Sequence, residues 1–414
     1  MHILLIHQAF AGLDEAGGTR HFEMARILAQ KGHRVTIIAS PISYITGKST
    51  TNEKANTKKQ EPIPGVTILR VATYSGLHRS FFHRMISFFS FMISSFIAGL
   101  QVRKVDLVWG TSPPIFQGFT AWLLSFLKGV PFLFEVRDLW PAFAVAVGVL
   151  KNKVLIRLSL WLERFLYRRA AKVVVNSPGY LDHVKAHGAR DVVLIPNGVD
   201  PEMFTITDHT VHNIWLDKKK GHFIVLYAGA HGLSNDLPTV LQAAKLLEKE
   251  PAIRFWLVGD GKEKANLIAQ ANAMQLTNLD FFPSVSKLEM NQVLAASDAD
   301  IAILLPIPLY KTTYPNKVFD YMAAGKPVVL AIDGVIRQVV ENANAGIFAE
   351  PGNPAQLVDA IDYLHKHSDI ALQMGLNGKK YVTVNFNRKD LTEKFRTVIE
   401  EMVYTHERKD SGSR

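Results

Sequence analysis

The chain has 414 residues, which is enough for two or three domains with sizeable hydrophobic cores. Hydrophobic residues make up 48% and charged residues 20% of it, which excludes a globally disordered chain and a fibrous repeat. Cysteine is absent, so disulfide scaffolds, cysteine zinc sites and a cysteine nucleophile are excluded as well. The formal net charge of +10 favours a phosphate-rich ligand, nucleic acid or an anionic membrane surface.

Short apolar runs alternate with amphipathic segments along most of the chain. This pattern is typical of parallel strands buried on both faces and joined by helices. We therefore predict an α/β protein built from two Rossmann-like, doubly wound domains. The predicted strands are residues 2–7, 35–39, 66–71, 107–110, 132–136, 173–176 and 192–195, then 224–227, 254–258, 279–282, 299–304, 327–330 and 346–349.

Three segments depart from this alternation. Residues 47–64 are polar and rich in Lys, Thr and Asn, so we expect a long mobile loop. Residues 86–100 are the most apolar stretch, but 15 residues are too few for a membrane span, which predicts a core or interfacial helix. Residues 407–414 are expected to fray. The first strand lacks the features of a secretory signal, so a cytosolic chain is expected.

Two glycine-rich turns follow predicted strands. Gly17 and Gly18 lie between the first strand and a helix, where backbone can approach an anion at the helix N-terminus. A tight turn without a ligand is the alternative. Gly259 and Asp260 follow a strand of the second domain, but Lys264 stands where a dinucleotide fingerprint needs its last glycine. An NAD site is therefore disfavoured, and a ligand-lining turn is left open.

Residues 314–329 combine the largest number of ligand-type groups. Pro315 precedes a short helix, so that Asn316 and Lys317 fall in its first turn. Free N–H groups, the positive helix end and an ammonium group suit a diphosphate there. Asp320 lies one turn further and can accept hydrogen bonds from a ribose. The alternative is a solvated lysine and a helix-stabilising aspartate.

A second group of charges ends the predicted strand at 132–136. Glu135, Arg137 and Asp138 fall where ligands bind in open α/β sheets, and unpaired charges are costly to bury. They either pair with each other or meet a ligand. Basic residues also flank the apolar segment 86–100, and others cluster from Arg157 to Lys172 on the helix predicted before residue 173. An apolar helix with basic neighbours is typical of an interfacial membrane anchor, and a core helix with solvated ends is equally compatible.

These motifs, in this order, resemble the GT-B fold glycosyltransferases of group 1, also called GT4. The resemblance rests on the segments GG at 17–18, KGHRV at 31–35, IPNGVD at 195–200, GDG at 259–261, LAASD at 294–298, DYMAAGKPVV at 320–329, GI at 346–347 and PGNP at 351–354. RDLWP at 137–141 and PNK at 315–317 resemble the branch of bacterial N-acetyl-L-fucosamine transferases of surface-polysaccharide synthesis.

The resemblance implies two domains facing across a cleft and a retaining, metal-independent transfer from a nucleoside-diphosphate sugar, with uridine as the family's usual base. The donor would be an N-acetylated deoxyhexose, and the acceptor a polysaccharide precursor linked to polyprenyl diphosphate. Lys317, Asp138 and Arg137 are the expected catalytic residues. The expected donor-binding residues are Gly17, Gly18, Gly229, His231, Gly259, Asp260, Tyr314, Pro315, Asn316, Lys317 and Asp320, with no metal ligand and no cofactor.

The family pattern is incomplete in this chain. The first glutamate of the E-x7-E motif is replaced by Thr312, the family's basic phosphate ligands are replaced by residues 227–232, and Arg137 stands for the usual histidine. Two other functions therefore stay open, a GT-B UDP-sugar 2-epimerase and a non-catalytic binding protein. Nucleic-acid binding is disfavoured because no recognised motif accompanies the charge.

We expect an acceptor domain over residues 1–197 and a donor domain over residues 198–386. Residues 387–414 are expected to form a helix that returns to the first domain and a frayed tail. The expected location is the cytoplasm, at the inner face of the plasma membrane.

Overall fold

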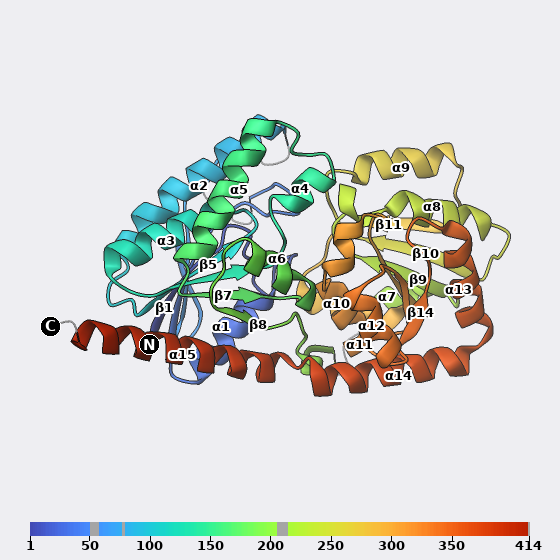
Figure 1. Ribbon diagram of the computed structural model, residues 1–414. Helices are drawn as coiled ribbons and strands as arrows, with labels where there is room; N and C mark the ends of the chain where they lie inside the picture. Colours follow the sequence, from blue (N-terminus) through green and yellow to red (C-terminus); the bar gives the residue numbers. More distant parts are fainter. Residues whose placement is uncertain (50–57, 77–78, 205–213, 413–414) are drawn as a thin grey trace. The chain divides into compact units, whose positions relative to one another are not determined.

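The computed structural model describes residues 1–49, 58–76, 79–204 and 214–412, and it divides into two compact units. The first unit contains Met1–Gly12, Gly17–Pro196 and Arg388–Arg414. The second contains Leu13–Ala16 and Asn197–Asn387. Each unit is an α/β layer structure around one sheet (Figure 1). The two Rossmann-like domains expected from the sequence are confirmed.

Within the described residues, the first unit has an eight-stranded sheet in the order β3-β4-β2-β1-β5-β6-β7-β8. All neighbours are parallel except β3 and β4, which are antiparallel. The strands are β1 (His2–Ile6), β2 (Arg34–Ala39), β3 (Lys58–Ile63), β4 (Val66–Arg70), β5 (Leu107–Ser112), β6 (Phe132–Val136), β7 (Lys172–Val175) and β8 (Val192–Leu194). β1, β5 and β6 are buried along their whole length, which explains their mostly apolar sequences.

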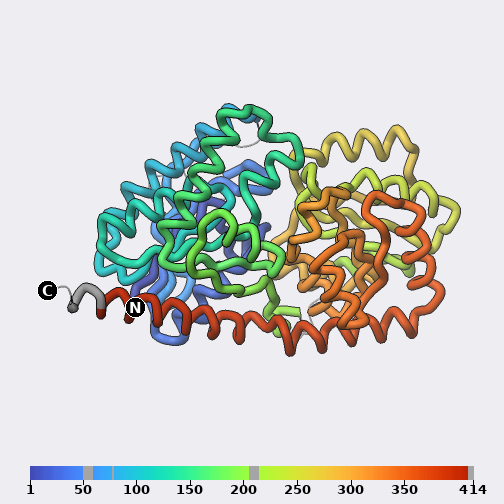
Figure 2. The backbone as a smooth tube through the Cα atoms, in the orientation of Figure 1, coloured from blue at the N-terminus to red at the C-terminus, as the bar shows by residue number. Residues whose placement is uncertain are grey.

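Helices cover both faces of this sheet. They are α1 (Arg20–Gln30), α2 (Phe81–Gln101), α3 (Phe116–Lys128), α4 (Ala142–Ala146), α5 (Lys153–Arg169), α6 (Leu181–Ala186), α15 (Arg388–Gly412) and the 3-10 turn η1 (Pro178–Tyr180). The last of the α-helices, α15, packs on α1, where Arg388 forms a buried ion pair with Glu23 (2.9 Å). The smooth trace in Figure 2 shows α15 lying along the N-terminal segment of the chain.

The second unit has a six-stranded, all-parallel sheet in the order β11-β10-β9-β12-β13-β14, counted over the described residues. Its strands are β9 (Phe223–Ala228), β10 (Ile253–Val258), β11 (Leu279–Phe282), β12 (Ala299–Ile303), β13 (Val328–Ala331) and β14 (Gly346–Phe348). Its helices are α7 (Ile214–Lys219), α8 (Leu237–Leu246), α9 (Lys264–Ala273), α10 (Lys287–Ala296), α11 (Asn316–Ala323), α12 (Val335–Asn342), α13 (Pro354–Lys366), α14 (Ser368–Asn385) and the 3-10 turns η2 (Pro201–Phe204), η3 (Leu233–Asn235) and η4 (Pro308–Thr312). Aliphatic side chains of β9, β10 and β12 fill the space between the sheet and α8 and α13.

Four expectations about local structure are wrong. The polar segment predicted as a loop over 47–64 ends in strand β3, and its residues 50–57 lie outside the described residues. β3 is an edge strand whose described side chains are mostly exposed, so it needs no apolar pattern. α2 has 21 residues and begins five residues before the predicted apolar stretch. α15 stays helical as far as Gly412, and Lys172 belongs to β7, not to the helix before it.

Candidate functional site

The turns after β9 and β10 fit together so closely that only glycine can occupy them. A Cβ atom on Gly259 would lie 1.8 Å from the carbonyl oxygen of Gly229. A Cβ on Gly261 would lie 2.4 Å from the carbonyl oxygen of His231. Asp260 fixes the same turn, because its carboxylate accepts the N–H of Gly261 at 2.8 Å. Gly229, Gly259 and Asp260 therefore shape the carboxyl edge of the second sheet, where open α/β sheets bind ligands.

Lys317 projects from the first turn of α11 toward this edge. Its Nζ donates to Tyr227 Oη at 2.8 Å and to Asn235 Oδ1 at 3.3 Å, and lies 4.0 Å from the centre of the Tyr227 ring. A Cβ on Gly229 would be 3.1 Å from Nζ, so the glycine leaves room for the ammonium group. Burial lowers the pKa of Lys317 to about 7. Among the described residues, no carboxylate forms an ion pair with it.

Two further polar groups at this edge are buried without a hydrogen-bond partner in the described parts of the chain. Both ring nitrogens of His231 and the Oδ1 atom of Asn316 are of this kind. Burial, followed by the charges of Lys264 and Lys317, lowers the pKa of His231 to about 4, so the imidazole is neutral. Unsatisfied buried polar groups are uncommon in folded proteins, and a ligand is one of the explanations for them.

Asp320 does not stand alone on α11. Its Oδ1 lies 2.6 Å from Nζ of Lys287, the first residue of α10. Lys287 was not singled out in the sequence, and only the contact across 33 residues reveals it. Lys264 was also missed as a site residue. Its Nζ donates to the carbonyl oxygens of Gly259 and Phe282, both at 2.7 Å, and so it holds the ends of β10 and β11 together.

Tyr314 and Pro315 lie just before α11 and set its start. Pro315 occupies the N-cap position. The carbonyl oxygen of Tyr314 accepts a hydrogen bond from Asn197 Nδ2 at 2.6 Å, and its ring packs edge-on against Phe319 and Phe386. The segment that places Asn316 and Lys317 is thus anchored at both its backbone and its side chains.

In the first unit, the charges predicted as one cluster separate into two groups. Glu135 is fully buried in β6 and binds Arg20 Nε at 2.9 Å and His21 Nε2 at 2.6 Å. The guanidinium group of Arg20 also donates to the carbonyl oxygens of Ile195 and Pro196. His21 and Arg20 hold the pKa of Glu135 below its usual range against the opposing effect of burial. Glu135 is therefore an internal anchor for α1, and its partner is Arg20 rather than Arg137.

Arg137 and Asp138 form the second group, beyond the end of β6. Arg137 donates to Thr111 Oγ1 at 2.9 Å and to the carbonyl oxygen of Pro113 at 3.0 Å, which fixes its guanidinium group against the end of β5. Burial raises the pKa of Asp138 to about 6, and the positive charge of Arg137 opposes this shift. A carboxyl group with this pKa at a sheet edge can accept a hydrogen bond from a hydroxyl group at neutral pH.

Gly17 and Gly18 form the turn before α1. Gly17 has φ +153°, and a Cβ atom on it would lie 2.8 Å from the Cβ of Ala11, so the turn tolerates no side chain there. Gly18 is exposed. The residues expected to bind the donor thus fall in two places, Gly17 and Gly18 in the first unit and the others in the second.

Comparison with known proteins identifies the family, which the geometry alone does not. A model of the glycosyl transferase 4-like domain matches residues 16–198, and a model of the glycosyl transferases group 1 matches residues 210–381. The chain is a group 1 glycosyltransferase. A relative from Escherichia coli K12, named as a colanic acid biosynthesis glycosyl transferase, is 27% identical over 365 residues, covering 84% of this chain and 89% of that one.

Solved structures of the same fold cover nearly the whole glycosyltransferase chain. Sucrose-phosphate synthase from Thermosynechococcus elongatus aligns with a TM-score of 0.77 over 98% of this chain and 99% of its own, at 17% identity. Anabaena HepE in complex with UDP and glucose aligns with a TM-score of 0.72 over 97% of this chain and 100% of its own, at 16% identity. At these identities the likeness concerns the fold, which confirms the GT-B prediction.

Proposed function

We propose that this glycosyltransferase transfers a sugar from a nucleoside-diphosphate sugar to a polysaccharide precursor, with retention of configuration and without a metal ion. The observation that carries the proposal is Lys317, a buried cation without an anionic partner in the described residues, at the N-terminus of α11. Such a group, together with the free N–H groups of a helix start, is suited to a diphosphate. The relative named for colanic acid biosynthesis supports the polysaccharide acceptor, and HepE, solved with UDP, supports uridine as the base.

The site residues of the second unit then have the following roles. Lys317, the backbone around Gly229 and the neutral His231 contact the diphosphate, whose negative charge grows as the anomeric C–O bond breaks. Asp320, held by Lys287, accepts the ribose hydroxyls. Gly259 and Asp260 keep the turn open for the nucleotide. Tyr314 and Pro315 act through the start of α11, which they position.

In this proposal, the first unit binds the acceptor. Asp138 accepts a hydrogen bond from a second hydroxyl group of the acceptor and so orients the attacking one, and Arg137 balances the charge nearby. In this mechanism the acceptor oxygen forms the new bond to the anomeric carbon while the leaving diphosphate takes its proton. The sugar keeps its configuration because the hydroxyl arrives on the face from which the diphosphate leaves. No protein nucleophile and no cofactor are needed.

A screen of nucleotide sugars by thermal shift identifies the donor, because a ligand at 100 times its Kd adds about 2.7 kcal/mol of stability. An N-acetylated deoxyhexose linked to UDP is the first candidate. Incubation of the donor without an acceptor then distinguishes the alternatives. A 2-epimerase converts the free donor, a binding protein leaves it intact after acceptor is added, and the transferase consumes it only with acceptor. EDTA is expected to leave the initial rate of transfer unchanged.

We further propose that the acceptor is linked to polyprenyl diphosphate and that the first unit attaches to the cytoplasmic face of an anionic membrane. The attachment surface consists of the outer sides of α2, α3 and α5, which lie next to one another (Figure 1). Its exposed apolar side chains are Phe82, Phe89, Ile93, Ile97, Leu100, Phe126, Leu127, Val154, Leu158 and Trp161. An aromatic row formed by Phe119, Trp122 and Phe165 joins α3 to α5.

The exposed charges in this part of the chain are positive. Residues 79–172 contain 13 Lys and Arg but four acidic residues, namely Asp106, Glu135, Asp138 and Glu163. None of these four is exposed. Basic residues near an anionic bilayer each add about 1 kcal/mol to its attraction, and the apolar side chains add the part that salt does not screen.

α2 is long and apolar enough to cross a membrane, judged by length and composition alone. Its inner side nevertheless packs on α3, and a Cβ on Gly99 would lie 2.4 Å from Cδ1 of Leu124. Ser87, Phe88 and Phe91 are buried on the same side. These contacts favour a helix that lies in the membrane interface as part of the folded unit.

Vesicle flotation tests the attachment. Phosphatidylglycerol vesicles should carry the chain at low salt, and high salt should release part of it. Phosphatidylcholine vesicles should bind it weakly. Trp161→Ser combined with Phe126→Ser should abolish flotation, whereas Leu372→Ser combined with Val384→Ser should not, although α14 exposes these two side chains as fully. Equal flotation of both double variants, or none for the unmodified chain, would contradict the proposal and leave a soluble acceptor.

A further inference from the structure

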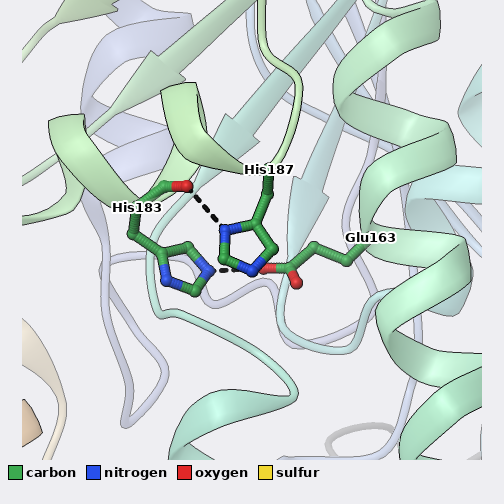
Figure 3. A group of neighbouring side chains, drawn as sticks. All are labelled: Glu163, His183 and His187. Atoms are coloured by element: carbon green, nitrogen blue, oxygen red, sulfur yellow. Dashed lines mark hydrogen bonds and ion pairs between the residues drawn. The ribbon is translucent and has the colours of Figure 1, made fainter.

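A second polar cluster lies in the first unit, apart from the residues assigned to glycosyl transfer. Glu163 projects from α5, and His183 and His187 come from the turn of α6 and its end (Figure 3). One ligand atom of each residue lies within 4.8 Å of the other two, and the described residues contain no other group of this kind. The sequence signal, two histidines four residues apart, is too common to be informative by itself.

Glu163 has a buried oxygen atom that none of the described residues satisfies. Its Oε1 accepts a hydrogen bond from Tyr167 Oη at 3.0 Å and lies 2.9 Å from His183 Nε2. Its Oε2 is buried and has no hydrogen-bond partner among the described residues. A buried carboxylate oxygen left without a donor is costly. This points to a positively charged or hydrogen-donating group that binds here in addition to the side chains.

His183 donates its Nε2–H to that carboxylate, and His187 leaves a nitrogen lone pair near it. His187 Nδ1 donates to the carbonyl oxygen of His183 at 2.8 Å, so its lone pair is on Nε2. The ring of His187 stacks on that of His183 with centroids 4.0 Å apart, and both rings lie beside Glu163 in Figure 3. A hydrogen bond from the far ring nitrogen to a carbonyl oxygen is the usual support of a metal-binding histidine.

We propose that Glu163, His183 and His187 bind a divalent zinc ion, with water as the fourth ligand. Two imidazoles and one carboxylate are a known ligand set for zinc, at bond lengths of about 2.0–2.2 Å. Tetrahedral ligands at that bond length are about 3.3 Å apart. Nε2 of His183 and Oε1 of Glu163 therefore separate by a few tenths of an ångström, and the proton on Nε2 moves through solvent to Nδ1, so that the imidazole that binds the ion stays neutral.

The ion would have a structural role. It would join α5 to α6 across the 20 residues that separate Glu163 from His183. α6 is a short helix of six residues, which gains little stability from its own hydrogen bonds. This inference goes beyond glycosyl transfer and does not depend on it, because zinc content and thermal stability are measured without a substrate.

The test uses the full chain without a histidine tag, treated with EDTA and then dialysed against a limiting concentration of zinc. We expect one zinc per chain by elemental analysis and a Tm that rises with zinc but not with Mg²⁺. Glu163→Gln and His187→Ala should each lose the bound zinc and the rise in Tm. His367→Ala is the matched control, because its ring makes the same bond to a carbonyl oxygen four residues earlier, at 2.8 Å from Tyr363.

Three results would overturn the proposal. No retained zinc would mean that Glu163 and His183 form a hydrogen-bonded pair completed by water. Equal zinc content in all variants would mean adventitious binding to surface histidines. A response to Mg²⁺ equal to that for zinc would mean a nonspecific cation effect. If Glu163→Gln fails to fold, His187→Ala still decides the question, since His187 is partly exposed and its removal opens no core cavity.

Discussion

The two units differ in whether a buried positive charge has an anionic partner. In the first unit, Arg20 meets Glu135 and two backbone carbonyl oxygens, so its guanidinium group has an anionic partner. In the second unit, Lys317 meets only neutral oxygens of Tyr227 and Asn235 in the described residues. A buried charge with an anionic partner is compensated, whereas a buried cation held only by neutral groups is poorly stabilised until an anion binds. Whether a buried charge has a partner of opposite charge thus distinguishes structural residues from site residues better than the residue type does.

The largest expected effect concerns the paired cluster. Glu135→Gln leaves Arg20 buried without its anion, which should lower the free energy of unfolding by about 3–5 kcal/mol. Urea denaturation of the full chain, followed at the transition in which the first unit unfolds, measures this loss of free energy. Glu248→Gln breaks the exposed pair with Lys245 (2.6 Å) and should cost less than about 1 kcal/mol. Equal losses in the two variants would remove Glu135 from its anchoring role.

The second effect concerns the unpaired lysine. Lys317→Met should lower kcat by about 10²–10³, because a charge aimed at the leaving diphosphate acts mainly in the transition state. The free energy of unfolding, in contrast, should rise in this variant. The folded pKa of about 7 lies below that of an unfolded lysine, so the charged amine opposes folding below pH 7, and the opposition fades as the pH rises toward 10.5.

Lys317→Met should therefore unfold at a higher urea concentration than the unmodified chain at pH 6, and the gain should shrink by pH 9. The control is Lys379→Met on α14, for which neither activity nor stability should change much. A variant that keeps full turnover would return Lys317 to a structural role. One that loses stability at pH 6 would contradict the electrostatic comparison itself.

Much of the fold could be predicted because burial leaves a trace in the sequence. The strands buried on both faces, such as β1 and β9, are continuous apolar runs. β3 has no such trace, since an edge strand is held by backbone hydrogen bonds to β4 and its described side chains face solvent. The extent of α2 was also missed, because its first turn combines Phe81 and Phe82 with His83 and Arg84.

The sites could be predicted only in part, because pairing over long separations leaves no local pattern. Glu135 and Arg137 are neighbours in sequence, yet Glu135 binds Arg20, which is 115 residues away. Asp320 binds Lys287, and Lys317 binds Tyr227 from 90 residues away. The sequence indicated which segments hold ligand-type groups. Which of those groups neutralise one another depends on strand order and side-chain direction.

The third prediction sharpens the comparison within α11. Asp320, unlike Lys317, has an ion-pair partner in Lys287. Asp320→Asn should weaken UDP binding by about tenfold, because a neutral amide accepts the ribose hydroxyl hydrogen bonds less strongly than a carboxylate. The sugar part of the donor should be recognised as before. Calorimetric titration with UDP measures the affinity, and an unchanged Kd would remove Asp320 from the nucleotide site.

The smallest effect is the uptake of about one proton, and it distinguishes the two buried cations most directly. Burial lowers the pKa of Arg20 only to about 10, so it stays charged at every pH near neutrality. Lys317, with a pKa of about 7, is mostly neutral at pH 8 in the free chain. A diphosphate beside it favours the charged form and raises its pKa. Binding of UDP at pH 8 should therefore take up close to one proton from the buffer.

Calorimetric titration with UDP in buffers of different ionisation enthalpy measures this uptake. At pH 8 the terminal phosphate of UDP is already ionised, since its second pKa is about 6, so it contributes little. Above pH 7 the affinity should fall with rising pH, by at most tenfold per unit, because each binding event must then protonate Lys317. Lys317→Met should bind UDP without proton uptake and with a flat pH dependence. If the variant takes up as many protons as the unmodified chain, another group titrates on binding, and Lys317 is already charged in the free protein, as Arg20 is.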